Sequence, residues 1–316
     1  METKSSTVKI YNGAIINRIF QIDITKYHPK NNPSDDNPSE NNPQKLKKIS
    51  NTIVIKCEDT TLYIKFPRQT EKIVFHTSVW KLLDFLAIEF TKINNYRCEK
   101  SKLKKEVCVS IEEYISLRSD TITDSNKKKI RKEIEEDLRL LSYMSISGEE
   151  SQKKRTRVLA RTAICEKEPY IKTGNIYFCF SESFADYLVN SYPAQYPLCL
   201  LKLEGRNPNS YSVGRKLAIH HSIRNNRVKG TNNKIGVKTL LGYCVSIPGY
   251  DEVMASDRQV KRRIYDAFEK TLDSLNFDCV LKDAEGNIVT RDEIHRMKFS
   301  QYQKLYVHFS VPGEIE

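Results

Sequence analysis

The sequence predicts an α+β protein in which one unit of three helices and a β-hairpin occurs twice, after an N-terminal extension rich in β-strand patterns. Two observations support this prediction. The stretch "KKKIRKEIEEDLRLL" at 127–141 aligns without gaps with "KRRIYDAFEKTLDSL" at 261–275. Further along, two similar strand patterns follow, "IYFCFS" at 176–181 and "LYVHFS" at 305–310. We therefore expect two domains, 77–180 and 196–316, joined by a linker helix at 181–195.

The N-terminal extension is expected to span 1–76. Its segments 7–24 and 51–66 are rich in β-branched residues that alternate roughly as in strands. Between them lies "KNNPSDDNPSENNPQKLKK", which is too polar and too rich in proline to bury a core. We therefore predict a disordered loop at 26–50.

Three helices are predicted in the first domain. In "TSVWKLLDFLAIEFTKI", 77–93, apolar residues recur every three or four positions, as one buried helical face requires. A short helix is predicted at 110–117. A long third helix is predicted at 124–144, with Asp124 or Ser125 as its N-cap because short polar side chains satisfy the free N–H groups there.

The second domain repeats this order, with helices predicted at 213–226, 235–244 and 256–275. Ser256 and Gln259 have the spacing of a capping box, so we expect the third helix to begin at Ser256. Its apolar stripe must face the core. We expect Arg258, Lys261, Arg262 and Tyr265 to point away from that core.

Cations at the start of a helix are unfavourable in isolation, because the helix N-terminus already carries a partial positive charge. Four of them, at 258, 261, 262 and 263, therefore indicate that a polyanion docks there, and the net charge of +12 agrees. Two helices, a recognition helix and a two-stranded wing are the order of a winged helix-turn-helix, whose third helix enters the DNA major groove. The sequence thus predicts two tandem winged helix-turn-helix domains.

The predicted DNA-contacting residues lie on the two third helices and on the first wing, 147–161. Arg258 and Arg262 are favoured as base readers, because guanidinium groups bind bases bidentately. The lysine-rich first helix and the wing are better suited to phosphates. The full set is Arg258, Lys261, Arg262, Arg263, Tyr265, Lys127, Lys128, Lys129, Arg131, Lys132, Lys153, Lys154, Arg155 and Arg157.

The second half carries a family resemblance. "YPLCLLKLEGRNPNSYSVGRKLAIHHSIRNN", "IGVKTLLGYCVSIPGYDEV" and "KRRIYDAFEKTLDSL" are similar to the replication initiators of iteron-containing plasmids, phages and integrative elements. The resemblance implies a non-enzymatic protein that binds double-stranded DNA at origin repeats, opens the origin and recruits the host replicative helicase or initiator. It also implies a homodimeric form and a place in the bacterial cytoplasm.

Two alternatives remain open from the residues. One is a transcriptional regulator of a mobile element, and the other is a rolling-circle nicking enzyme with His220, His221 and a tyrosine nucleophile. The histidines are adjacent and would point about 100° apart on a helix, so a shared metal is disfavoured. The eight cysteines show no zinc-site spacing, and no apolar run is long enough to cross a membrane. We therefore expect no cofactor, no metal and no membrane association.

Overall fold

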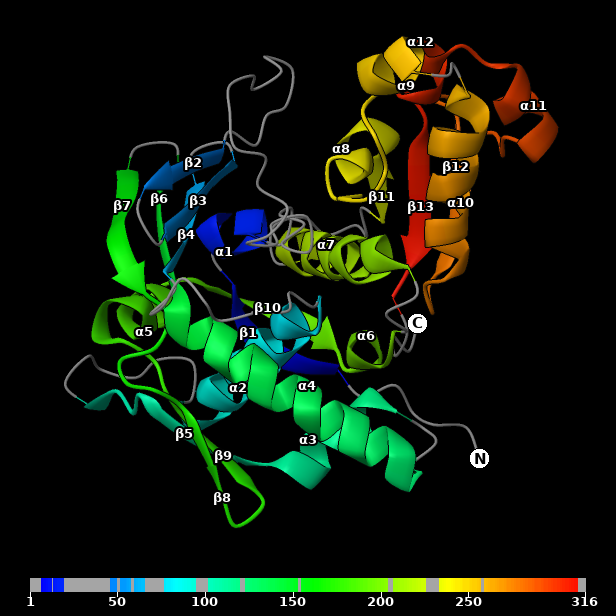
Figure 1. Cartoon of the computed structure of the whole chain (residues 1–316). Coiled ribbons are helices and arrows are strands. Elements are labelled where there is room, and N and C mark those ends of the chain that lie inside the picture. The colour runs from blue at the N-terminus through cyan, green and yellow to red at the C-terminus, as the bar shows by residue number, and fades with distance from the viewer. Residues whose placement is uncertain are drawn as a thin grey trace. The chain divides into compact units, whose positions relative to one another are not determined.

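The computed structural model describes residues 7–12, 14–19, 46–49, 52–57, 60–65, 77–94, 102–119, 123–152, 155–203, 207–225, 233–256 and 259–311. The contacts between residues divide the chain into two compact units. We call 9–193 the N-terminal unit, and 194–316 together with 1–8 the C-terminal unit. Figure 1 labels the helices and strands.

One part of the N-terminal unit consists of three helices and a small antiparallel sheet. The elements are α2 (Ser78–Ile93), β5 (Glu106–Ser110), α3 (Ile111–Arg118), α4 (Asp124–Tyr143), β8 (Tyr170–Lys172) and β9 (Asn175–Cys179). The sheet order is β5-β9-β8. Thr173 and Gly174 connect β8 to β9 and both have positive φ, as a two-residue hairpin turn of type I′ requires.

The three predicted helices of this unit are confirmed, and α4 packs against α2 (Figure 1). The predicted apolar stripe of α4 is buried, with Ile134 and Leu141 fully inaccessible. The predicted cap is wrong: the N-cap is Thr123, whose hydroxyl accepts a hydrogen bond from the Asn126 N–H. Asp124 already lies inside the helix, so its side chain cannot serve as the N-cap.

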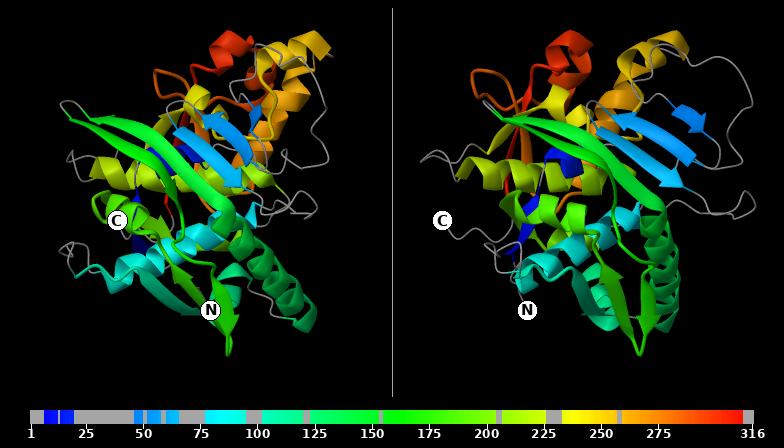
Figure 2. Two further views of the ribbon diagram at one scale, coloured as in Figure 1. Left: turned by 60° about the vertical axis from the view of Figure 1, so that its left-hand side comes forward. Right: turned by 90° about the vertical axis from the view of Figure 1, so that its left-hand side faces the viewer.

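The N-terminal strands belong to a five-stranded antiparallel sheet, in the order β2-β3-β4-β6-β7. The bounds are β2 (Leu46–Ile49), β3 (Thr52–Cys57), β4 (Thr60–Lys65), β6 (Met144–Gln152) and β7 (Arg155–Ala163). Figure 2 shows β6 and β7 as a long hairpin. The predicted first wing, 147–161, is therefore part of this larger sheet, and the hairpin of the smaller sheet is β8–β9.

Two predictions for the extension need correction. The strand predicted at 7–24 ends at Asn12, because β1 (Thr7–Asn12) is followed by the helix α1 (Ala14–Ile19), which packs on β4 and β6. The buried Ile16 shows that the apolar residues there cover a sheet and are not part of one. Within the predicted loop 26–50, β2 is a strand because its backbone pairs with β3. The other residues of that loop lie outside the described part of the chain.

The C-terminal unit contains the second set of elements. These are α6 (Cys199–Lys202), α7 (Pro208–Asn225), β11 (Lys234–Gly236), α8 (Val237–Leu241), α9 (Tyr250–Ser256), the π-helical turn η3 (Lys261–Tyr265), α10 (Asp266–Asp273), β12 (Asp278–Lys282), α11 (Arg291–Arg296), α12 (Phe299–Tyr302) and β13 (Tyr306–Ser310). Its sheet order is β11-β13-β12. In the N-terminal unit, α5 (Glu182–Val189) confirms a helix in the predicted linker, and β10 (Tyr192–Pro197) follows where the chain passes to the C-terminal unit.

Apart from β6 and β7 in the N-terminal unit and α9, α11 and α12 in the C-terminal unit, the two units share one order of elements: a long helix, a short strand, a short helix, a third helix and two further strands. In both, the last of the three strands lies between the other two, in the orders β5-β9-β8 and β11-β13-β12. The third helix is α4 in one unit and η3–α10 in the other. Among the described residues, no helix combines the length and the apolar character needed to cross a bilayer.

A buried lysine near α4 makes the stability of the N-terminal unit depend on pH. The Lys81 side chain on α2 is 4% exposed, and burial, with the nearby Arg118 charge, lowers its pKa to about 7. An unfolded chain keeps this amine protonated up to about pH 10. Between these values the unfolded state binds more protons, so the free energy of unfolding must rise with pH.

We expect the free energy of unfolding to increase by on the order of 2 kcal/mol between about pH 7 and pH 9 through this one group. Lys81→Met should be more stable than the parent at pH 7, and the difference should close near pH 10. Urea unfolding of the parent and of Lys81→Met at about pH 7, 9 and 10 measures the pH dependence of the parent and the difference between the two proteins. An identical pH slope in the parent and in Lys81→Met would contradict the assignment.

Candidate nucleic-acid interface

The third helix of the C-terminal unit begins later than the sequence predicts. Ser256 is the last residue of α9, where its hydroxyl donates to the Val253 carbonyl at 3.3 Å. The predicted capping box is therefore wrong, because Ser256 closes one helix and does not open the next. Arg258 lies outside the described residues. The helix is continuous from Val260 to Asp273 and contains a π turn, in which the Asp266 N–H donates to the Lys261 carbonyl.

Tyr265 belongs to the core and not to the surface, so its predicted contact with DNA is wrong. Its side chain is 1% exposed. The ring stacks on Tyr302 at a centroid distance of 4.1 Å, and the hydroxyl donates to the Met297 carbonyl at 3.3 Å. Tyr265 lies three residues before Phe268 and seven before Leu272, so all three share one helical face. The rest of the predicted stripe is buried at Ile264, Phe268, Leu272 and Leu275.

Two cations at the start of this helix are exposed to solvent. Lys261 and Arg262 are exposed, and the Arg262 guanidinium makes only a long contact of 3.5 Å to the Gln259 carboxamide. Arg263 is half-buried and donates to the Ser256 hydroxyl at 2.9 Å, which ties the end of α9 to the third helix. Lys261 and Arg262 are therefore the described residues of this helix that can best reach an anionic partner.

The later part of this helix contacts α11, which lies between β12 and β13 in the chain. Asp266 accepts hydrogen bonds from Arg291 at 3.1 Å and from His295 at 2.9 Å. Burial alone would raise the pKa of Asp266, but the hydrogen bonds from Arg291 and His295 lower it. Arg291 also pairs with Glu269 at 3.4 Å. These contacts fix the orientation of the helix that carries Lys261 and Arg262.

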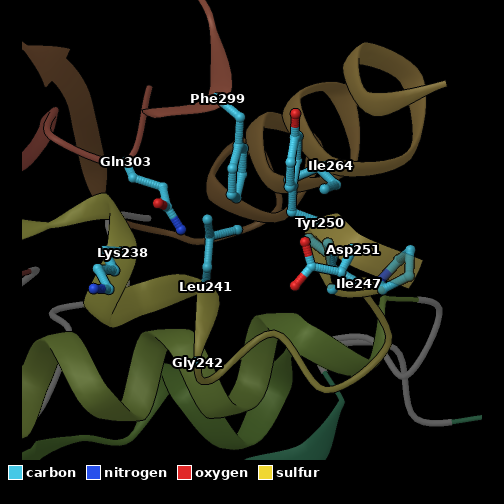
Figure 3. Close-up of a pocket in the computed structure, with 11 residues that line it drawn as sticks. Lys238, Leu241, Gly242, Ile247, Tyr250, Asp251, Ile264, Phe299 and Gln303 are labelled. Atoms are coloured by element: carbon cyan, nitrogen blue, oxygen red, sulfur yellow. The ribbon is translucent and has the colours of Figure 1, made fainter. Parts of the chain in front are cut away.

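A pocket of about 550 Å³ lies beside the start of the same helix. Figure 3 shows Tyr250 of α9 beside Phe299 of α12 in the pocket wall, and the two rings stack with a centroid distance of 4.4 Å and an interplanar angle of 4°. Ile264 contributes to the wall, and Lys238 lies at the edge. The aromatic pair joins α9 to α12 beside the start of the third helix.

In the N-terminal unit, acidic residues neutralise part of the basic tip of α4. Lys127 pairs with Glu112 of α3 at 3.3 Å, and Arg131 pairs with the same carboxylate. Hydrogen bonds from Arg131 and Lys127 lower the pKa of Glu112, which keeps it charged. The two cations therefore join α3 to α4 and present less charge to a ligand than the sequence predicts.

Three other cations in the first half of α4 face solvent. Lys129 and Lys132 contact Glu133 and Glu136 only at 3.9 Å, and their side chains are 77% and 78% exposed. Ion pairs of this kind are weak and easily exchanged. Lys128 is exposed and makes no hydrogen bond or ion pair with another described residue. The usable cations of α4 are thus Lys128, Lys129 and Lys132.

The predicted wing contacts cannot be placed. Lys153 and Lys154 lie outside the described residues, as do the side chains of Arg155 and Arg157 in β7. Arg161 is described, and its guanidinium lies 4.2 Å from the centroid of the Tyr63 ring and donates to the Ser145 hydroxyl. Arg161 therefore stabilises the five-stranded sheet.

The adjacent histidines have structural partners. The His220 ring donates from Nε2 to the Lys234 carbonyl at 3.1 Å, and His221 Nδ1 bonds to Asn233 Oδ1 at 2.6 Å. His221 is 2% exposed, and both rings lie about the same distance from Phe309, 6.5 and 6.4 Å between centroids. They join α7 to the small sheet. In the described ranges, no three His, Cys, Asp or Glu side chains are placed to hold a metal ion.

Comparisons with known proteins give no family. No protein-family model matches the chain, and no curated protein matches it. Among solved structures, a selenomethionine crystal structure of domains 2 and 3 of RctB matches with a TM-score of 0.39 and 11% identity, over 85% of this chain and 90% of that one. A second structure, RctB domains 2-3, has a TM-score of 0.35 and 11% identity, over 69% and 76%. Values this low assign neither family nor function.

Proposed function

We propose that this chain binds double-stranded DNA through the starts of the third helices of its two units. One observation carries the proposal: the same order of elements and the same sheet order occur twice, and each copy has exposed cations early in its third helix. Helix, strand, helix, helix and hairpin, with the last strand central, are the order of a winged helix-turn-helix. In helix-turn-helix modules the start of the recognition helix enters the major groove.

The two third helices would have different roles, one in reading bases and the other in binding phosphates. Lys261 and Arg262 lie on a helix whose position is set by α9, α11 and α12, and a rigid support is what base reading requires. Arginine can bind guanine with two hydrogen bonds, so Arg262 is the proposed base reader. The lysines of α4 are point charges on flexible side chains, and they would bind phosphates and release counterions.

Within this class, we propose a replication initiator of a plasmid, phage or integrative element in the bacterial cytoplasm. The resemblance of the second half of the sequence supports this choice. The chain would bind repeats at an origin, promote opening of the adjacent DNA and recruit the host replicative helicase or initiator, with a homodimer as a further form. It would act by binding and bending DNA, without covalent chemistry.

Footprinting on the non-coding DNA beside its own gene tests the proposal. The purified chain is incubated at about 50 and 200 mM salt, with and without a divalent metal. We expect protection at evenly spaced repeats, weaker at the higher salt and without strand cleavage. A single protected palindrome would support a transcriptional regulator in its place. A metal-dependent nick would overturn the non-enzymatic mechanism.

Lys128→Ala tests the phosphate role of α4. We expect weaker binding on every DNA sequence, and a plot of log K against log salt whose slope is smaller by about one unit, because one phosphate contact is lost. Lys172→Ala is the matched control, since Lys172 is an exposed lysine on β8 of the same unit. A slope that is unchanged in Lys128→Ala, or changed equally in both variants, would contradict the contact.

A further inference from the structure

The small sheet of the C-terminal unit has an outer face that the proposed function does not use. In its antiparallel register, Lys234 of β11 and Val280 of β12 lie on either side of His308 in the central strand β13. Lys282 lies opposite Tyr306 in the same strand. Paired residues on neighbouring strands point to the same face of a sheet. These five side chains therefore share one face, which we call the Tyr306 face.

The Tyr306 face is directed to solvent. Val307 and Phe309 are 0% and 4% exposed, so the opposite face packs in the core. Side chains alternate along a strand, which turns Tyr306 and His308 outward. Val280, in the middle of the outer strand β12, is 39% exposed. The result is a solvent-facing sheet surface with an aromatic ring on its central strand and an aliphatic side chain on the neighbouring outer strand.

Positive charge is concentrated on this face. The Lys234 ammonium lies 5.1 Å from the centroid of the Tyr306 ring. Partial burial and the charges of Lys282 and Lys234 lower the pKa of His308, so both amines lie within electrostatic reach of it. Asp278 is the single carboxylate of the three strands, and it stands at the far end of β12, where it accepts a hydrogen bond from Ser310.

The equivalent sheet of the N-terminal unit differs in the surroundings of its aromatic residue and of the cations next to it. Lys105 and Lys167, which lie outside its strands, form ion pairs with carboxylates at 2.7 and 2.6 Å, whereas Lys172 within β8 has no carboxylate partner among the described residues. Tyr177, which occupies the place of Tyr306 in the aligned strands, is covered by the stacked ring of Tyr170 at 4.8 Å. The amines of Lys234 and Lys282 have no carboxylate partner among the described residues.

We propose that the Tyr306 face binds single-stranded nucleic acid, with a base stacked on Tyr306 beside Val280 and phosphates at Lys234 and Lys282. Proteins that bind single strands combine aromatic rings with a positively charged track. A duplex keeps its bases stacked on one another, so an aromatic ring on a solvent-facing sheet surface favours a single strand. The proposal shares with the proposed function only the choice of nucleic acid as ligand, and it uses residues outside the third helices.

Fluorescence anisotropy with the full chain tests it, using a labelled oligothymidine of about 20 nucleotides and, separately, a labelled duplex carrying the footprinted site. We expect the double variant Lys234→Gln/Lys282→Gln to bind the oligothymidine at least ten-fold more weakly. Tyr306→Leu should lose about five-fold or more, and Tyr306→Phe should bind as the parent does, because stacking needs the ring and not the hydroxyl. Duplex affinity should change less than two-fold in all three.

Lys172→Gln, on the sheet of the N-terminal unit, is the control and should leave single-strand binding unchanged. Unaltered oligothymidine binding in the double variant, or an equal loss for Tyr306→Phe and Tyr306→Leu, would overturn the proposal. Competition by polyglutamate as effective as by oligothymidine would also overturn it, in favour of an acidic protein partner. If the chain binds the oligothymidine but no duplex, the proposed function is refuted while the proposal for the Tyr306 face is supported.

Discussion

Replacing Tyr265 with alanine is expected to lower the free energy of unfolding of the C-terminal unit by about 3 to 5 kcal/mol, the range for a large aromatic side chain removed from a core. The ring is 1% exposed and stacks on Tyr302. Its removal would leave a cavity between the third helix and α12, and the Met297 carbonyl would lose its hydrogen bond. Urea unfolding measures the change.

Tyr265→Phe is the matched variant. It keeps the stacked ring and removes only the hydroxyl, so a loss of about 0.5 to 1.5 kcal/mol is expected. Because the hydroxyl points into the protein, the affinity of this variant for duplex DNA should remain within two-fold of the parent. A ten-fold loss of affinity in a stable Tyr265→Phe protein would mean that the hydroxyl contacts DNA after all.

Arg262→Ala should weaken binding to the specific duplex site by about 1 to 3 kcal/mol, which is about 5- to 150-fold. The guanidinium is exposed and has only the long contact to Gln259, so little must be broken before it binds a base. Its loss should also relax the preference at one base pair, since a bidentate contact discriminates between bases. The fold should be unaffected, because exposed substitutions usually change stability by less than about 0.5 kcal/mol.

Competition binding with a set of duplexes that differ by one base pair measures both effects. Lys270→Ala is the control, because Lys270 is an exposed cation on α10 of the same helix, beyond the π turn. It should weaken binding little and leave the base preferences intact. An equal loss by Arg262→Ala on every duplex would assign Arg262 to phosphate contact and refute its role in base reading.

The helices could be predicted because their information is local. In α2 and α4 the apolar residues recur every three or four positions and are buried, although the fold also buries most of the polar residues of α2. The alignment of 127–141 with 261–275 also predicted that both third helices would bury the same stripe. β5 and β11 were missed, because strands of five and three residues carry too short a pattern to be distinguished from loops.

The predictions for Ser256 and Tyr265 were wrong because their surroundings depend on residues outside the local sequence pattern. Ser256 has the spacing of a capping box with Gln259, yet α9 extends to Ser256 and the third helix begins after it. Tyr265 seemed polar enough for the surface, but the insertion between β12 and β13 supplies Tyr302 as a stacking partner. Neither α9 nor this insertion has a counterpart in the N-terminal unit, so the repeat itself could not reveal them.

The order of residues by itself determined the repeated unit, the positions of the long helices and the basic character of their starts, because helical periodicity and charge act over a few neighbouring residues. Only the tertiary structure decided which of those charges are available. Glu112, on another helix, neutralises Lys127 and Arg131, whereas Lys128 and Arg262 stay exposed.

Strand pairing decided which residues share the Tyr306 face. β13 lies between β11 and β12 and brings Lys234, Lys282 and Tyr306 onto one face, although more than 70 residues separate Lys234 from Tyr306. Hydrogen bonds between strands join segments that are distant in the chain, and no local pattern in the sequence specifies such partners.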